Sequence, residues 1–163
     1  MKHYQESANL YNEAITIREG QPENYRDRIC SARSNRAVAH AYLGEMPAAV
    51  DDADRAPKEL DSAIAMEPAA QVVALNNIAV AYLMEKRFIK AEDCLQRAFA
   101  LVEAASVLCE PQVVANYAFL LPQTGRKSAA AAAQLRAQEL SSQHRGKTGS
   151  ETIDASEIDS FGK

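Results

Sequence analysis

The chain has 163 residues, a length that fits one domain of ordinary size. Hydrophobic residues make up 47% of it and charged residues 25%, which excludes wholesale disorder, a collagen-like fold and a disulfide scaffold. Glycine and proline number only six each and alanine is abundant, so the composition predicts an all-α protein. The formal net charge of -4 counts against a nucleic-acid partner, because phosphate binding usually requires a basic excess.

The first residues, MKHYQESANLYNEA, lack the apolar stretch of a secretory signal. No apolar run approaches the roughly 18 residues that a membrane-spanning helix needs. The cysteines Cys30, Cys94 and Cys109 are odd in number and lack metal-ligand spacing, which favours reduced thiols. We therefore expect a cytoplasmic protein that makes no contact with a membrane.

A repeat with a period near 42 residues runs along the chain. The sequence SNRAVAHAYL at 34–43 is matched by NNIAVAYLME at 76–85, with Asn35 and Asn77 42 residues apart. A further unit begins at Asn116, 39 residues after Asn77. The other residues that repeat are Ala37 and Ala79, Ala39 and Ala81, Ala49 and Ala91, and Ala14, Ala56 and Ala98. The chain is thus predicted to be an array of similar structural units.

Each full unit has the pattern of two helices joined by a short turn. In chain order we expect a partial first repeat over 3–20, which supplies one helix, and then units over about 25–67, 69–108 and 111–141. The third unit shows the pattern best, with apolar residues at helical spacing. They are Leu75, Ile78, Ala79 and Tyr82 before the turn, and Phe88, Ala91, Leu95, Ala98 and Phe99 after it.

Prolines and glycines punctuate the expected helices. Gly44 and Gly125 fall in turns inside units, where a positive φ is tolerated. Pro57 lies inside an expected helix and predicts a kink or a break there. Glu103 replaces a closing proline, so that helix is expected to run towards Val107. The polar residues 142–163 are expected to form a disordered tail.

These features resemble the tetratricopeptide repeat (TPR) family. The resemblance rests on the spacing Leu75-x2-Ile78-Ala79-x2-Tyr82 and on Ala91-x3-Leu95-x2-Ala98. The long period and the sequence ALNNIAVAYL are similar to the kinesin-light-chain-like branch. The resemblance implies a right-handed superhelical solenoid of antiparallel helix pairs, about three and a half repeats long, over residues 1–141.

In such arrays the first helices line a concave surface that binds peptides, and the resemblance places Asn35, Asn77 and Asn116 at one inward position. A carboxamide offers a donor and an acceptor, so three of them could hold the backbone of an extended peptide. The alternative is ordinary exposed or capping asparagines. Neighbouring candidates for peptide contact are Arg33, Val80, Leu83, Met84 and Phe119, with Val38 and Val73. Each of these could instead pack between repeats.

Charge is segregated along the chain. Residues 23–36 contain four arginines, whereas residues 45–67 contain seven acidic residues. Two solvated helix faces explain this pattern. The alternative is a basic patch that receives an acidic segment of a partner, with Arg33 as one of its cations.

No motif of catalysis stands out. The sequence lacks a phosphate-binding glycine loop, GxSxG and HExxH, and its histidines have no metal-ligand spacing. Asp51, Asp52 and Asp54 are expected to be solvated surface residues. A co-chaperone-like clamp for a carboxylate is disfavoured, because Val73 and Asn77 stand where its two cations belong. We therefore expect a protein that is not an enzyme and needs no metal or cofactor.

The leading hypothesis is a protein-interaction module, an adaptor or scaffold that binds an extended peptide. One alternative is a structural subunit that docks through its repeat edges. Another is a regulatory TPR fragment of a larger protein, and self-association through the exposed first half-repeat also stays open. A helical-repeat RNA reader fits poorly, because the predicted groove is apolar and rich in amides.

Overall fold

The computed structural model of the chain describes residues 2–19, 26–63, 66–105, 111–126, 132–133 and 135. The described residues are almost entirely helical and contain no strand, which confirms the expected all-α class. The six helices are α1 (Lys2–Glu19), α2 (Arg26–Leu43), α3 (Met46–Ser62), α4 (Pro68–Met84), α5 (Phe88–Ala105) and α6 (Pro111–Gln123). The predicted tail at 142–163 and most of the second half of the last unit lie outside this part of the chain.

Three helices end in the same hydrogen-bonded cap. Gly44, Lys86 and Gly125 have φ angles of 79°, 59° and 82°, so each reverses the chain in the left-handed region. The following backbone N–H then reaches back five residues, as in a Schellman motif. These bonds run from Glu45 to His40, from Arg87 to Tyr82 and from Arg126 to Leu121, at 2.9, 2.8 and 2.8 Å. The sequence repeat thus has a counterpart in backbone geometry, and the expected positive φ at both glycines is confirmed.

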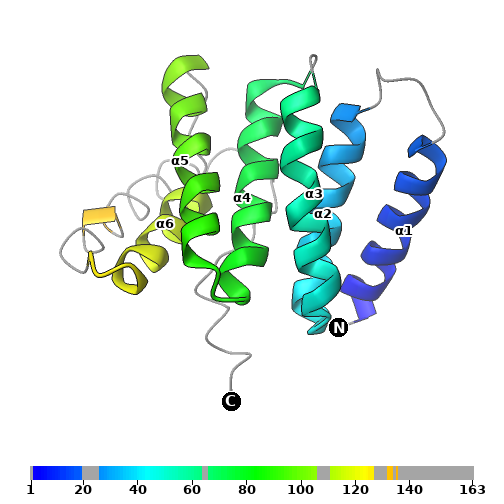
Figure 1. Cartoon of the computed structure of the whole chain (residues 1–163), viewed down its shortest axis with the longest axis horizontal. Coiled ribbons are helices and arrows are strands. Elements are labelled where there is room, and N and C mark those ends of the chain that lie inside the picture. Colours follow the sequence, from blue (N-terminus) through cyan, green and yellow to red (C-terminus); the bar gives the residue numbers. More distant parts are fainter. Residues whose placement is uncertain are drawn as a thin grey trace, which may run out of the picture.

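Figure 1 shows α1 at one end of the array, then α2 and α3, then α4, with α5 and α6 at the other end. The pairs α2 and α3, and α4 and α5, are each joined by one of these caps and pack closely against each other. Contacts also link α2 to α4 and α4 to α6, so the first helices of successive pairs meet. At the N-terminal end, α1 packs against α2. The array therefore places α4 at its centre.

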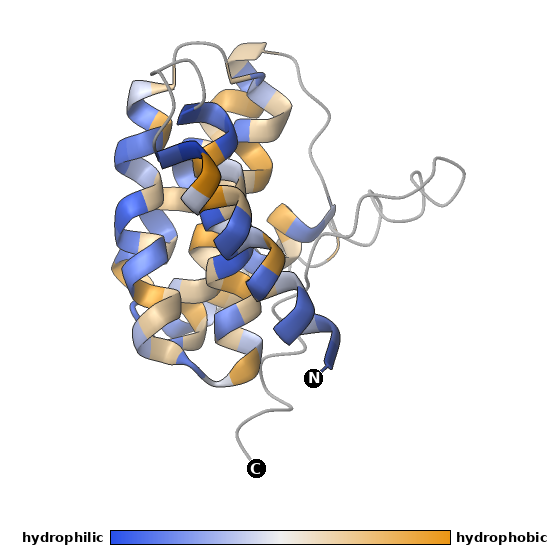
Figure 2. Ribbon diagram, turned by 90° about the vertical axis from the view of Figure 1, so that its right-hand side faces the viewer, coloured by the Kyte–Doolittle hydropathy of each residue, from blue (hydrophilic) through white to orange (hydrophobic). Residues whose placement is uncertain are grey.

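The core follows the repeat. Ala37, Ala79, Ala56 and Ala98 are all fully buried, and their small side chains let neighbouring helices approach closely. The largest wholly buried apolar side chains fill the space between them, among them Leu75, Ile78, Leu83, Leu95 and Leu120. Figure 2 shows that hydrophilic residues lie along the outer sides of the helices. Burial of apolar side chains at each helix contact is what holds the row together.

Of the kink or break expected at Pro57, the break is wrong, because α3 runs unbroken from Met46 to Ser62. A proline inside a helix leaves the carbonyl four residues earlier without its N–H donor. Here that carbonyl belongs to Ala53, and the hydroxyl of Tyr82 on α4 lies 3.0 Å from its oxygen. The same hydroxyl lies 2.8 Å from Oδ1 of Asp54, so its one proton is shared between the two acceptors and compensates in part for the missing bond. The helix does continue past Glu103 as far as Ala105, and Val107 lies outside the described residues.

Candidate functional site

Asn35 and Asn77, the first two predicted site residues, lie directly against each other. Asn77 donates from Nδ2 to Oδ1 of Asn35 across the α2–α4 contact, at 2.7 Å. Asn35 is half-buried and Asn77 is 6% exposed. Within the described structure, Nδ2 of Asn35 and Oδ1 of Asn77 take part in no other hydrogen bond. The pair thus keeps one donor, on Asn35, and one acceptor, on Asn77, that no described residue satisfies.

Asn116 has a different partner. Its Nδ2 donates to Oδ1 of Asn76 at 2.8 Å, and both side chains are completely buried between α4 and α6. Nδ2 of Asn76 is buried as well and has no hydrogen-bond partner among the described residues. This second pair is a polar contact inside the apolar core, where an unsatisfied donor is costly.

The three predicted asparagines therefore do not form one continuous row. Two of them pair with each other, whereas Asn116 pairs with Asn76, 40 residues earlier. The last unit is offset by 39 residues from Asn77 and by 40 from Asn76, so the repeat pattern left its register ambiguous by one residue. The dipeptide Asn76-Asn77 was the sequence feature that left two possible partners for Asn116. The direction in which α6 crosses α4 decides which of the two residues pairs with Asn116.

The apolar candidates lie mostly inside contacts between helices. Val38 and Val80 are buried together with Tyr42, and Tyr4 and Met84 pack against this cluster. The remaining candidates divide between burial and partial exposure: Leu83 is buried in the main core, Phe119 packs against that core while half-buried, and Val73 is half-buried. Packing between helices thus accounts for Val38, Val80 and Leu83, whereas Met84, Phe119 and Val73 keep some accessible surface.

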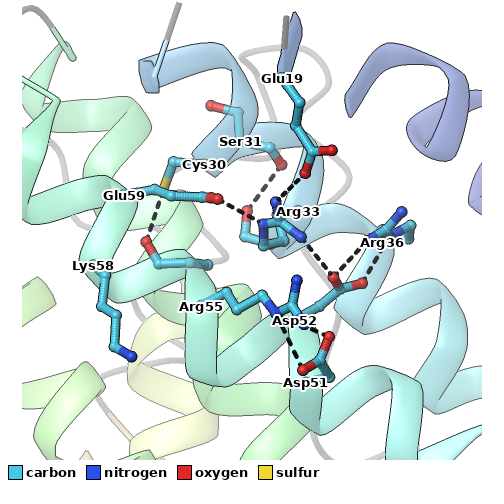
Figure 3. A network of polar contacts seen from close by, with 12 residues as sticks. Glu19, Cys30, Ser31, Arg33, Arg36, Asp51, Asp52, Arg55, Lys58 and Glu59 are labelled. Atoms are coloured by element: carbon cyan, nitrogen blue, oxygen red, sulfur yellow. Dashed lines mark hydrogen bonds and ion pairs between the residues drawn. The ribbon is translucent and has the colours of Figure 1, made fainter. Parts of the chain in front are cut away.

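Arg33 lies at the centre of a network of charged side chains (Figure 3). Although it is only 4% exposed, its guanidinium meets three carboxylates. Nε donates to Glu59 at 2.8 Å, Nη1 to Asp52 at 3.4 Å and Nη2 to Glu19 at 3.0 Å. Arg36 holds Asp52 from the other side with two bonds, of 2.8 and 2.6 Å. A buried arginine requires such partners, because an unpaired charge in the interior is strongly unfavourable.

This network relates the basic and the acidic segments to each other. Arg33 and Arg36 belong to the arginine-rich segment on α2, while Asp52 and Glu59 belong to the acidic segment on α3. Asp52 is 2% exposed, so the expectation that it lies on a solvated surface is wrong. The acidic group that the basic residues bind is thus supplied by the neighbouring helix of the same chain.

The buried thiols are chemically quiet. Burial raises the pKa of Cys30 to about 12, with the carboxylate of Glu59 adding to the effect. Burial likewise raises the pKa of Cys94 to about 12. Both side chains therefore stay protonated near neutral pH and are poor nucleophiles.

One surface carboxylate is held in its charged form. Although partial burial opposes ionisation of Asp54, hydrogen bonds from Lys90 and Tyr82 outweigh it and lower the pKa of this carboxyl. The bonds measure 2.5 Å from Lys90 Nζ and 2.8 Å from the Tyr82 hydroxyl. This cluster ties α3 to α4 and α5. Across the ranges described above, no three metal-binding side chains come together.

Comparison of the chain with protein-family models, with curated proteins and with solved structures finds no match. None of the described helices combines the length and the apolar character needed to cross a bilayer. The functional argument for this chain therefore rests on its own side chains. The Asn35–Asn77 pair and the charged network around Arg33 are its most specific polar features.

Proposed function

We propose that the chain is a protein-interaction module built from TPR-like helix pairs, and that it binds an extended segment of a partner protein along α2 and α4. It acts by binding and catalyses no reaction. The observation that carries the proposal is the carboxamide pair of Asn35 and Asn77. Its remaining donor and acceptor match the C=O and N–H that one residue of an extended peptide presents.

The surroundings of the pair support this role. On α2, Asn35, Val38 and Tyr42 lie at spacings of three and seven residues, and so share one face. On α4, Asn77, Val80 and Met84 repeat that spacing. Val38, Val80 and Tyr42 are buried within this face, so the apolar contact beside the amides falls to Met84, which keeps accessible surface and can adapt to the side chain it meets.

The repeated caps support the TPR-like architecture. Equivalent turns close α2, α4 and α6, and the first helices of the pairs contact one another in succession. Stacked helix pairs of this kind present an extended surface formed by equivalent helices. A protein with this arrangement serves as an adaptor or scaffold in the cytoplasm.

The proposal is tested by affinity capture from native lysate with the full chain, read by mass spectrometry. The double variant Asn35→Ala/Asn77→Ala removes both members of the pair, so it leaves no buried amide unsatisfied and should stay folded. We expect it to lose the partner, while the control Asn9→Ala, on an exposed position of α1, retains it. Equal capture by the wild type and the double variant, with equal helicity by circular dichroism, would refute the role of the pair.

A second candidate is docking through the edge of the array. Leu10 and Ile17, seven residues apart on α1, are 64% and 67% exposed, and so form an apolar strip on the outer face of the first helix. Self-association through this strip would make the chain a structural subunit. Sedimentation velocity of the wild type and of Leu10→Glu/Ile17→Glu distinguishes the two functions, because only edge docking requires these side chains.

A further inference from the structure

Among the described residues, three polar or aromatic contacts join α1 to α2, and Tyr4 also packs against the cluster that contains Val80 of α4. The rings of Tyr4 and Tyr42 stack with centroids 4.7 Å apart and planes 6° from parallel. Farther along, Nη1 of Arg36 donates to Oδ1 of Asn12 at 2.8 Å. At the end of α1, Arg33 donates to Glu19. Residue numbers rise along α1 while they fall along α2, so the two helices lie antiparallel with the contacts spread over their whole length.

On the side of α2 that contacts α1, the arginine side chains are held in position by α3. Two of the donors of Arg33 are bound to Asp52 and Glu59, both on α3. Arg36 is likewise fixed by its two bonds to Asp52. The carboxylates of α3 therefore position both guanidinium groups and leave Nη2 of Arg33 and Nη1 of Arg36 directed at α1. Figure 3 shows Arg33 with Glu19 reaching it from above and Glu59 from the left.

The anchoring of α1 is slight by comparison. Only Ala8 and Ile15 are buried on it, whereas most of the side chains of α4 are. The side chain of Glu19 is 56% exposed, and an ion pair with such an exposed partner contributes little to stability. Elements with few buried apolar contacts open first, well below the free energy of global unfolding. Release of α1 would therefore bare a preformed surface.

We propose that the surface of α2 beneath α1 is a docking site for an amphipathic helix of a partner protein, which takes the place of α1. We define this helix-docking surface by Tyr42, Arg36 and Arg33. The partner helix fits when it carries the same chemistry in the same order. The partner helix should carry an aromatic residue, then a small apolar residue four positions later and an amide or acid eight positions later. A large apolar residue should follow at eleven positions and an acid at fifteen. This is the order of Tyr4, Ala8, Asn12, Ile15 and Glu19 on α1.

This site goes beyond the function proposed above. The Asn35–Asn77 pair would hold the backbone of an extended segment, whereas the helix-docking surface reads side chains on one face of a helix, as other helix-in-groove contacts do. Stacking on Tyr42 supplies the apolar anchor. The two preformed guanidinium donors select the polar residues, because charge-assisted bonds are the stronger kind.

The test uses the full chain and a fluorescein-labelled peptide of residues 2–19 as the probe, read by fluorescence anisotropy. We expect saturable binding that tightens about tenfold when the chain carries Tyr4→Ala, because weaker docking of its own α1 raises the fraction of chains with a bare surface. The control chain Gln5→Ala, changed at the adjacent exposed position, should bind the peptide as the wild type does. A peptide carrying Tyr4→Ala and Glu19→Gln should bind the Tyr4→Ala chain about tenfold more weakly.

Three outcomes would overturn the proposal. One is equal affinity of the peptide for all chains, and another is no binding even to the chain variant Tyr4→Ala when it keeps its helicity. The third is a dimer in sedimentation that exchanges α1 between copies, since the occupant would then be a second copy rather than a partner protein. No variant in this test changes Asn35 or Asn77, so its failure would leave the proposed peptide-binding function standing.

Discussion

Asp51 and Asp52 are neighbours in the sequence with opposite surroundings. Asp51 is exposed, and among the described residues it pairs with Arg55, four residues on along the same helix, at 3.0 Å. Asp52 is buried between two guanidinium groups. The helix directs adjacent side chains to different faces, so one acid meets solvent and the other meets α2.

Replacing these two acids should therefore have very different effects on stability. Asp52→Ala removes the carboxylate shared by Arg33 and Arg36 and leaves buried charge uncompensated, which we expect to lower the free energy of unfolding by about 3 kcal/mol. Asp51→Ala should lower it by less than about 0.5 kcal/mol, the scale of an exposed pair on one helix. Urea unfolding followed by circular dichroism measures both. If both variants lowered the free energy of unfolding equally, the charged network around Arg33 would not stabilise the fold.

The two described cysteines should be inert in the folded protein. Cys30 is fully buried, Cys94 is 3% exposed, and both thiols have a pKa near 12. Because the thiolate is the reactive form, a Cys109→Ser variant should react with Ellman's reagent at pH 8 only as fast as it unfolds. Both thiols should react at once in guanidinium chloride. Rapid reaction of either one under native conditions would contradict the packing of α2 or α5.

At the scale of helices, the bond between Tyr82 and Ala53 explains how α3 tolerates Pro57. Tyr82→Phe removes the hydroxyl proton that the Ala53 carbonyl shares with Asp54, and we expect it to lower the free energy of unfolding by about 1–3 kcal/mol. In a Pro57→Ala background the new N–H can donate to the same carbonyl. The cost of Tyr82→Phe should then fall by about 1 kcal/mol in a double-mutant cycle. Strict additivity of the two substitutions would mean that the hydroxyl does not compensate for the proline.

The sequence predicted the helices well but not every break in them. The apolar spacing indicated the two full pairs and Gly44 indicated the turn of the first, because both are local properties of the chain. The continuity of α3 through Pro57 was missed, since it depends on a hydroxyl supplied 25 residues later by Tyr82 on another helix. The local sequence around Pro57 cannot indicate a contact with a side chain on another helix.

For the whole molecule, the period near 42 residues predicted the succession of similar helix pairs, since residues one period apart must meet equivalent neighbours. It also brought Asn35 and Asn77 into one candidate site, and the structure joins them by a hydrogen bond. The period did not predict the pairing of Asn116 with Asn76, nor the burial of Arg33 between α2 and α3. Both depend on how two helices cross, and a shift of one residue changes which side chains meet.

The central claim is that Asn35 and Asn77 hold the backbone of an extended peptide. The most direct test selects peptides for the full chain from a random linear display library and then scans a selected peptide by N-methylation, which removes one backbone N–H at a time. We expect one N-methylated position to weaken binding at least about tenfold, and to have no such effect on the Asn35→Ala/Asn77→Ala variant. If every N-methylated peptide binds as well as its parent, or if the sensitive position is unchanged in the double variant, the carboxamide pair does not bind peptide backbone.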